Sequence, residues 1–237
     1  MRIGVDMGHT LTGTGTGAVG YVKETDKNRE VGKRLIEILR AKGHSVYNCT
    51  VDKSENDLAD RVALANKQDL DLFISLHLNA YVKTENPMGV ETYIWNGSWN
   101  GKEPNRAIAL RVNNKLANSI GWKNRGVKEA NYYVLRNTKA PAILVELGFC
   151  DSRYDMNLWN TEKIAIALFE AITNTTYTST SSNNTSSSTG SNTASKGLVR
   201  VKKDGVQVGA YSKDENMLNA VKKCVTEGFT VITIERV

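Results

Sequence analysis

The sequence has few of the residues that mark disulfide-rich or membrane-spanning proteins. Its 237 residues include three cysteines, three prolines and three histidines. Cys49, Cys150 and Cys224 are far apart, odd in number and outside any CxxC motif, which indicates buried, reduced thiols and excludes a disulfide framework or a cysteine metal site. No apolar run approaches the ~18 residues of a membrane span, and the N-terminus lacks the apolar region and cleavage site of a secretory signal. We therefore expect no membrane span, and a chain that stays in the cytoplasm after synthesis.

Acidic side chains are fewer than basic ones. The formal net charge is +6 at pH 7 and the pI is about 9.1, while the hydrophobic share of 40% and the charged share of 24% are ordinary for a globular protein. This charge favours an anionic polymer as partner, such as cell wall, a membrane surface or nucleic acid. We do not expect nucleic acid, because no basic stripe interleaved with aromatic residues is present.

One segment lacks charged residues altogether. Residues 174–195 consist almost entirely of Ser, Thr and Asn. Such a segment cannot bury enough apolar surface to offset its ordering entropy, so it predicts a flexible linker. We therefore expect a first domain at residues 1–173, the linker at 174–195, and a small second domain at 196–237.

The first domain alternates between two kinds of pattern. Short apolar runs that predict strands are Arg2–Asp6, Ser45–Cys49, Leu72–His77, Val90–Trp95 and Ala142–Leu147. Apolar residues at helical spacing lie between and after them, at 31–39, 108–120 and 165–172. This alternation predicts an α/β fold, a mostly parallel sheet with flanking helices.

Two of the three histidines and one glutamate end predicted strands. His9 follows the first strand, His77 ends the third and Glu146 lies near the end of the last. Ligands of open α/β sheets bind at the carboxyl ends of the strands, so these residues should share one edge. Two imidazoles with a nearby carboxylate are typical of a catalytic zinc site, and a further carboxylate can act as general base. Hydrogen-bonded structural histidines are the alternative, and spacing alone does not choose a third ligand among Glu24, Asp26 and Glu30.

Two further features favour other interpretations. Gly15–Gly20 reads GxGxxG, but the seven residues 8–14 separate the first glycine from the strand, and the next strand ends near Asp52, too far along for the ribose-binding acidic residue. A mobile loop is therefore favoured over a dinucleotide site. His44 lies in a turn from a helix into a strand, at the opposite end of the sheet from His9. We expect a structural role for it.

The second domain is short and basic. Eight basic and five acidic side chains give residues 196–237 a net charge of +3. The dipeptide Asp204-Gly205 between two apolar runs predicts a hairpin. Ser212–Glu215 is a capping box ahead of a helical pattern, and Phe229–Glu235 reads as a last strand. The expected fold is a small α+β domain of order ββαβ, whose exposed edge and sheet face favour a homodimer.

Several motifs of the first domain resemble those of a known enzyme family. They are Gly8-His9, Glu24–Asn28, Leu58–Asn66 with Asp71–Ala80, Arg125–Lys128, Tyr133–Arg136 and Pro141–Phe149. Together, over about residues 1–172, they resemble the zinc-dependent N-acetylmuramoyl-L-alanine amidases of the amidase-3 family. Thr10 stands where the family usually has glycine, and Asp151 where it commonly has asparagine. Neither position is a ligand, so activity should survive.

The resemblance implies a site and a reaction. It places Zn²⁺ on His9, Glu24 and His77, with Glu146 as the catalytic carboxylate that takes a proton from zinc-activated water. The water then cleaves the amide between N-acetylmuramic acid and L-alanine in peptidoglycan. Asn79, on the same face of the strand as His77, is expected to contact substrate or a metal ligand.

The biological role is less constrained by the motifs. The second domain is loosely similar to half of the sporulation-related repeat that binds septal glycan, which predicts binding to anionic cell-wall polymer. A catalytic domain, a polar linker and a basic tail without a signal peptide resemble a phage endolysin of a Gram-positive host, made in the host cytoplasm and acting on the wall after release. A mother-cell autolysin of sporulation, or a catalytically silent wall-binding protein, are the alternatives.

Overall fold

The chain forms two compact units, residues 1–180 and 181–237, in a computed structural model. The structure describes residues 1–178, 199–203, 206–211 and 232–236. Among these residues, no helix combines the length and the apolar character needed to cross a membrane.

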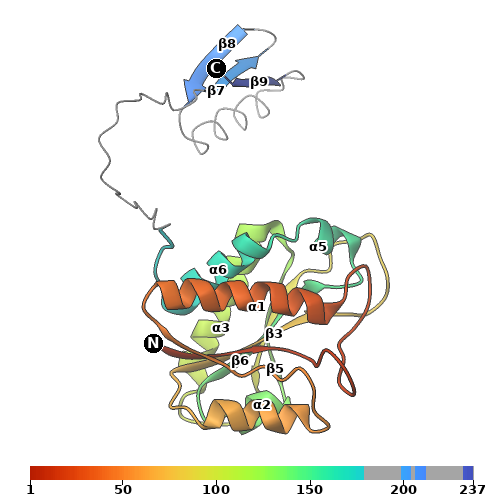
Figure 1. Ribbon diagram of the computed structural model, residues 1–237, viewed down its shortest axis with the longest axis vertical. Coiled ribbons are helices and arrows are strands. Elements are labelled where there is room, and N and C mark those ends of the chain that lie inside the picture. Colours follow the sequence, from red (N-terminus) through yellow and green to blue (C-terminus); the bar gives the residue numbers. More distant parts are fainter. Residues whose placement is uncertain (179–198, 204–205, 212–231, 237) are drawn as a thin grey trace, which may run out of the picture. The chain divides into compact units, whose positions relative to one another are not determined.

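A six-stranded sheet is the centre of the first unit (Figure 1). Its strands are β1 (Arg2–Met7), β2 (Ser45–Asn48), β3 (Leu72–Asn79), β4 (Val90–Trp95), β5 (Asn124–Ala130) and β6 (Ala142–Phe149). The order across the sheet is β2-β1-β3-β6-β4-β5. All neighbours are parallel except β4 and β6, which are antiparallel. The expected mostly parallel sheet is therefore present.

Helices cover both faces of this sheet. They are α1 (Glu24–Ala41), α2 (Asp57–Asn66), α3 (Lys102–Leu116), α4 (Tyr133–Asn137), α5 (Arg153–Asn157) and α6 (Thr161–Thr173), with a π-helical turn η1 (Ala117–Gly121) directly after α3. α1, α3 and α6 pack on one face around the larger apolar core. α2 and α4 pack on the other face around a smaller core. The fold is thus a three-layer α/β arrangement.

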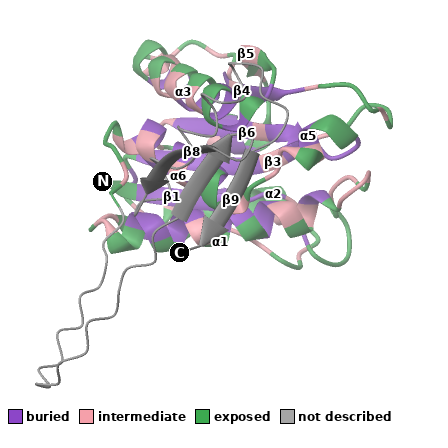
Figure 2. Cartoon of the chain, turned by 90° about the horizontal axis from the view of Figure 1, so that it is seen from above, coloured by how far each residue is buried: buried purple, intermediate pink, exposed green. Residues whose placement is uncertain are grey.

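The burial of the central strands follows from their sequence. β1, β3 and β6 are almost continuous apolar runs, and their inner residues are buried on both faces of the sheet (Figure 2). α1 carries its apolar residues at helical spacing, with Val31, Leu35 and Leu39 fully buried against the sheet. Cys49 and Cys150 are buried free thiols, as expected.

The sequence prediction found most of these elements and missed others. All five predicted strands and the three predicted helical faces of the first domain lie in observed elements. β5 was missed because its residues Asn124–Ala130 are polar and only half-buried at the sheet edge. α2, α4 and α5 were also not predicted; α4 and α5 have five residues each, too few to show a periodic pattern.

The described part of the second unit is a three-stranded antiparallel sheet. Its strands are β7 (Val199–Lys203), β8 (Val206–Tyr211) and β9 (Ile232–Arg236), in the order β8-β7-β9. These strands lie where the sequence predicted strands. The predicted helix and most of the predicted linker lie outside the described residues, so the ββαβ order stays a prediction.

Candidate active site

His9 is held in an unusual backbone conformation just after β1. Its φ angle of 65° lies in the left-handed region, which residues other than glycine rarely adopt. The ring nitrogen Nδ1 lies 2.9 Å from the carbonyl oxygen of Gly15, which is an acceptor only, so Nδ1 carries the proton. The other nitrogen, Nε2, lies 3.1 Å from Oε1 of Glu24.

His77 lies on β3, and a glycine makes room for its ring. A Cβ atom on Gly8 would lie 2.2 Å from Nε2 of His77, closer than any side chain permits. The ring therefore packs directly on the backbone of Gly8. Its Nδ1 atom lies 3.0 Å from Oε1 of Glu24, and the two imidazole rings meet edge to face with centroids 4.7 Å apart.

Glu24 brings the two histidines together. It is the first residue of α1, and its side chain is buried. Oε1 faces both imidazoles and accepts a hydrogen bond from the backbone of Leu78, and Oε2 accepts one from the backbone of Ala18. Burial raises the pKa of this carboxyl, but hydrogen bonds and charge from His77 and His9 outweigh burial, so the pKa lies well below its usual range. Glu24 is therefore a carboxylate.

The three donors fit a zinc ion. Their ligand atoms all lie within 4.8 Å of one another. Zinc ligands at about 2.0–2.1 Å in tetrahedral geometry are ~3.3 Å apart, close to the 3.0 and 3.1 Å from Glu24 Oε1 to the two histidines. The hydrogen bond from His9 to a backbone carbonyl is also typical of histidines that bind zinc. This donor set is the one that the resemblance implied.

Glu146 lies beside these donors on the neighbouring strand. β3 and β6 are in parallel register, with His77 opposite Glu146. Oε2 of Glu146 is buried and has no hydrogen-bond partner among the described residues. Burial, together with the charges of Glu24 and Glu91, raises the pKa of Glu146 to about 8. An unpartnered, easily protonated carboxyl next to a metal site is the arrangement that a general base requires.

A cavity of about 260 Å³ opens in front of this group. His9, His77 and Glu146 line it together with Leu58 from α2 and the tyrosine pair Tyr132-Tyr133 at the start of α4. Both tyrosines are exposed. Apolar and aromatic walls around a few polar groups are typical of a small-molecule site.

Asn79 lies outside that cavity. Its amide donates to Oε1 of Glu91 at 2.7 Å, and its Oδ1 accepts from the backbone of Ala80. Glu91 is buried and also accepts from Tyr93, Arg125 and Lys128. Asn79 thus contacts a carboxylate that faces Glu146, and lines an adjacent cavity of about 400 Å³.

Two buried arginines hold the loop that carries His9, and no sequence pattern predicted this role for them. Arg29 of α1 donates to the carbonyl oxygens of Met7, Gly8 and His9. Arg61 of α2 pairs with buried Asp6 of β1 at 2.6 Å and also bonds the carbonyl of Met7. Both are nearly fully buried. Arginine-to-carbonyl contacts follow no spacing rule, so they could only be found in three dimensions.

The glycine-rich segment contacts the site, and the third histidine, His44, lies outside it. The glycine-rich segment Gly15–Gly20 forms a loop between His9 and Glu24, and a Cβ on Gly17 would meet Glu24 Oε2 at 2.7 Å. The loop is therefore packed against the site. His44 contacts the N-terminal amine at 3.2 Å and belongs to no metal-ligand cluster among the described residues.

Known proteins with similar sequences or structures point to one family. The family model described as N-acetylmuramoyl-L-alanine amidase matches residues 3–176. An uncharacterized protein of Clostridium perfringens is 37% identical over 67% of this chain and 47% of its own length. The sporulation-specific N-acetylmuramoyl-L-alanine amidase of Bacillus subtilis is 27% identical over 99% of this chain and 84% of its own. The endolysin of Bacillus phage SPP1 is 32% identical over 63% and 55%. The chain thus spans about half the length of the first and third of these relatives.

Solved structures agree. The catalytic domain of an endolysin targeting Clostridia difficile is 27% identical, has a TM-score of 0.64 and aligns over 75% of this chain and 99% of its own. An N-acetylmuramoyl-L-alanine amidase from Clostridium difficile 630 is 26% identical, with a TM-score of 0.63 over 73% and 95%. With the family model matching well over half of the residues, the chain belongs to the N-acetylmuramoyl-L-alanine amidase family, amidase-3.

Proposed function

We propose that this protein is a zinc-dependent peptidoglycan hydrolase that cleaves the amide bond between N-acetylmuramic acid and L-alanine. The observation that carries the proposal is the cluster of His9, Glu24 and His77 within 4.8 Å, beside the unpartnered carboxyl of Glu146. Family membership supports the reaction, and the donor set supports the metal.

The three metal-binding residues and Glu146 have different roles in the proposed reaction. His9, Glu24 and His77 would hold the ion, which supplies Lewis-acid chemistry and makes water nucleophilic at neutral pH. Glu146 takes the proton of the attacking water and passes it to the departing amine of L-alanine. A cation held by the three donors would lower the pKa of Glu146 from about 8, which would favour the carboxylate that accepts the proton.

Metal binding is tested by elemental analysis of protein purified without chelator. We expect zinc near one equivalent per chain, and its loss in His77→Ala. His44→Ala is the matched control, because His44 is the third histidine and lies outside the cluster. Zinc content unchanged in His77→Ala would remove the assignment. Chelation should abolish clearing of cell-wall suspensions, and added zinc should restore it.

Two biological roles are compatible with this activity, a phage lysin and a mother-cell autolysin, and similar proteins support each of them. The endolysin relatives and the endolysin catalytic domain support a phage lysin of a Gram-positive host. The sporulation-specific amidase aligns over 99% of the chain, including the second unit, whereas the phage SPP1 endolysin aligns over 63%. This difference in coverage favours a mother-cell autolysin. Expression confined to sporulating cells would support the autolysin, and expression only after prophage induction would support the lysin.

We further propose that the protein acts on the wall after release from the cytoplasm and that its second unit holds anionic wall polymer. The net charge of +3 in residues 196–237 supports this. Binding of the full chain to purified walls should weaken as salt rises from 50 to 500 mM, by about tenfold or more, because screening acts on such contacts. Salt-independent binding would contradict the electrostatic account.

A further inference from the structure

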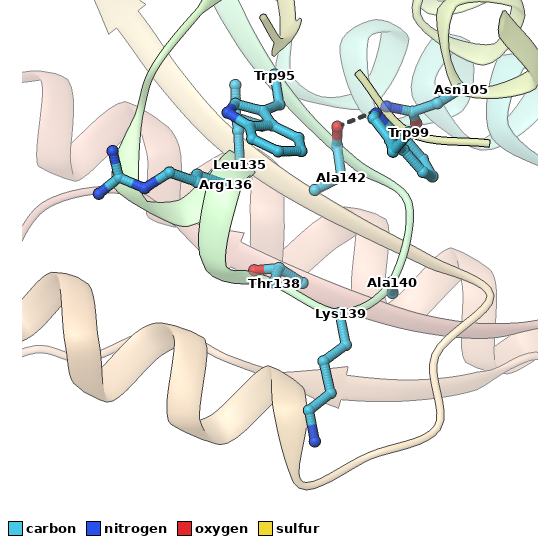
Figure 3. Close-up of a pocket in the computed structure, with 9 residues that line it drawn as sticks. All are labelled: Trp95, Trp99, Asn105, Leu135, Arg136, Thr138, Lys139, Ala140 and Ala142. Carbon is cyan, nitrogen blue, oxygen red and sulfur yellow. Dashed lines mark hydrogen bonds between the residues drawn. The ribbon is translucent and has the colours of Figure 1, made fainter. Parts of the chain in front are cut away.

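A second cavity lies on the same unit, at the start of β6, four residues before Glu146. It encloses about 180 Å³ and is lined by residues from β4, the β4–α3 loop, α3 and α4. Figure 3 shows Trp95 and Trp99 on one side of it, with Asn105, Thr138 and Ala142 around them. None of the metal-site residues contributes to it. The cavity is small enough to hold a single ring rather than a whole drug-sized ligand.

The two tryptophans are placed by a repeated tripeptide. Residues 95–101 read W-N-G-S-W-N-G. A Cβ on Gly97 would lie 2.2 Å from the ring of Trp95, and one on Gly101 would lie 2.1 Å from the ring of Trp99. Each indole therefore packs flat on a glycine two residues later, and both rings remain half-buried. Two tryptophans fixed at one cavity offer flat apolar surfaces to a ligand.

Two buried polar atoms of this cavity lack a partner. Asn105 is 2% exposed and Thr138 is 8% exposed, yet Oδ1 of Asn105 and Oγ1 of Thr138 make no hydrogen bond within residues 1–178. The amide of Asn105 cannot be turned round, because its Nδ2 donates to the carbonyl of Ala142 at 2.9 Å (Figure 3). Both atoms are closed to water in this structure, so a ligand reaches them only when a neighbouring side chain shifts. Leaving such groups unpaired is costly, so a ligand that satisfies them would bind with a gain.

The charges near the cavity point elsewhere. The guanidinium of Arg136 donates to Asn131 and lies 5.8 Å from the ring centroid of Tyr133. Lys139 extends away from the two tryptophans in Figure 3. Among the described residues that line the cavity there is no carboxylate. The interior is thus neutral and polar, with aromatic walls, which suits a ligand that carries hydroxyl or amide donors on an uncharged ring.

We propose that this cavity binds one sugar ring of the glycan strand, an N-acetylated hexosamine. The C–H face of a pyranose stacks on an indole ring, a hydroxyl or acetamido N–H donates to Oδ1 of Asn105, and Thr138 contacts a second hydroxyl. The choice of glycan as the source of this sugar rests on the function proposed above. A nucleobase could also stack between tryptophans, but its phosphates would find no cation directed into this cavity.

The position of the cavity would let it bind a second part of a long substrate. Ala142 and Glu146 lie on the same face of β6, four residues apart, which corresponds to ~13 Å. α4 borders both cavities, Tyr133 facing the one with Glu146 and Leu135 facing this one. A sugar held here therefore anchors a polymer whose amide bond is cut elsewhere on the same face.

The test is a titration of the full chain with soluble tri- and tetrasaccharides of N-acetylglucosamine, in which calorimetry and tryptophan fluorescence measure the binding. We expect binding that is about tenfold weaker in Trp99→Ala and clearly weaker in Thr138→Val, which removes only the hydroxyl. Trp159→Phe is the matched control, because Trp159 packs against Trp122 and does not line the cavity. With intact walls, Trp99→Ala should raise KM and leave kcat and the zinc content unchanged.

Other outcomes would overturn the proposal. Saccharide binding that is equal in wild type and Trp99→Ala would place the sugar elsewhere, for example on the second unit. Binding of a short single-stranded oligonucleotide that is lost in Trp99→Ala, without saccharide binding, would make the cavity a base-stacking site. The saccharides contain no amide to L-alanine, so binding by an enzyme that fails to cut walls would refute the proposed function and leave the sugar site standing.

Discussion

At the scale of single residues, Glu146 is in a position that costs stability. Its Oε2 atom is buried and has no partner in the described part of the chain, and this burial, together with the charges of Glu24 and Glu91, raises its pKa to about 8. A residue chosen only for stability would be neutral or apolar here. The unfavourable setting is explained if the carboxyl must exchange a proton during the reaction.

Glu146→Gln should separate chemistry from structure. The amide has the same shape but cannot take up a proton, so we expect wall hydrolysis to fall by ~10²–10⁴-fold while zinc content and circular dichroism stay unchanged. Initial rates of wall clearing, with zinc measured on the same samples, check this. A rate near that of the wild type would require another base.

The same substitution should stabilise the metal-free protein, and the gain should depend on pH. The folded-state pKa of about 8 lies above the ordinary value of 4.5, so the carboxyl contributes its stability below pH 4.5 and loses it as the pH rises toward 8. At pH 8, in chelator, Glu146→Gln should therefore gain ~1–3 kcal/mol over wild type, and at pH 4 little or nothing. Urea unfolding at both pH values measures the difference. A larger gain at pH 4 would contradict the assigned pKa.

The site residues were predictable to different degrees. His77 and Glu146 end apolar runs of parallel strands, and such runs predict both the strand and the edge where it ends. Glu24 could not be chosen from spacing, because the loop 10–23 decides which acidic residue of α1 reaches the histidines. Only the resemblance selected it. The role of Glu91 was not predicted, because the sequence of β4 does not indicate that Arg125 and Lys128 of β5 donate hydrogen bonds to it.

At the scale of elements, α1 supplies one proposed metal ligand, Glu24, and positions another, His9. Glu24 begins the helix, and Arg29, more than a turn later, donates to the carbonyls of Met7, Gly8 and His9. These bonds hold His9 in the left-handed conformation that its side chain disfavours. The helix therefore ties two of the proposed metal ligands to one rigid element.

Arg29→Met should weaken metal binding although Arg29 is not itself one of the proposed ligands. The long apolar side chain keeps most of the packing but frees three carbonyls, so we expect ~10–100-fold lower zinc affinity, as for other residues that orient ligands. Competition with a chromogenic chelator measures the affinity. Arg34→Met on the same helix is the control, because Arg34 pairs with surface residues Glu37 and Glu162. Equal affinities in the two variants would show that the loop holds its shape unaided.

The elements that sequence patterns missed share a physical cause. β5 is an edge strand whose side chains are half-buried and polar, so no apolar alternation marks it. α4 has five residues, and its identity as a helix depends on packing of Val134 and Leu135 on the smaller core. Local propensity decides long, buried elements, whereas contacts from elsewhere in the chain decide short or exposed ones.

At the scale of the whole molecule, the family match covers the first unit, whereas the role of the second unit is inferred from its strands and its charge. The first matches the amidase family over residues 3–176. For the second, three described strands form an antiparallel sheet of order β8-β7-β9. Among the described residues, β8 and β9 are the outer strands of this sheet, and the sequence-based prediction of a homodimer rests on edges of this kind.

The self-association of the second unit stays a prediction. We expect the full chain to form a twofold pair at tens of micromolar, since pairing would complete the sheet and double the basic charge toward the wall. Multi-angle light scattering of the full chain, compared with a chain ending at residue 180, measures it. A monomer mass for the full chain, with wall binding intact, would remove the dimer.

The central claim is that this protein cuts the amide between N-acetylmuramic acid and L-alanine with zinc held by His9, Glu24 and His77. The most direct measurement is the chemical identity of the bond cleaved in purified Gram-positive peptidoglycan. The account predicts new N-terminal alanine in step with wall clearing, no rise in reducing sugars, and neither effect in chelator-treated protein or in Glu146→Gln. Wall clearing with new reducing ends and no new N-terminal alanine, or clearing undiminished by chelator, would contradict it.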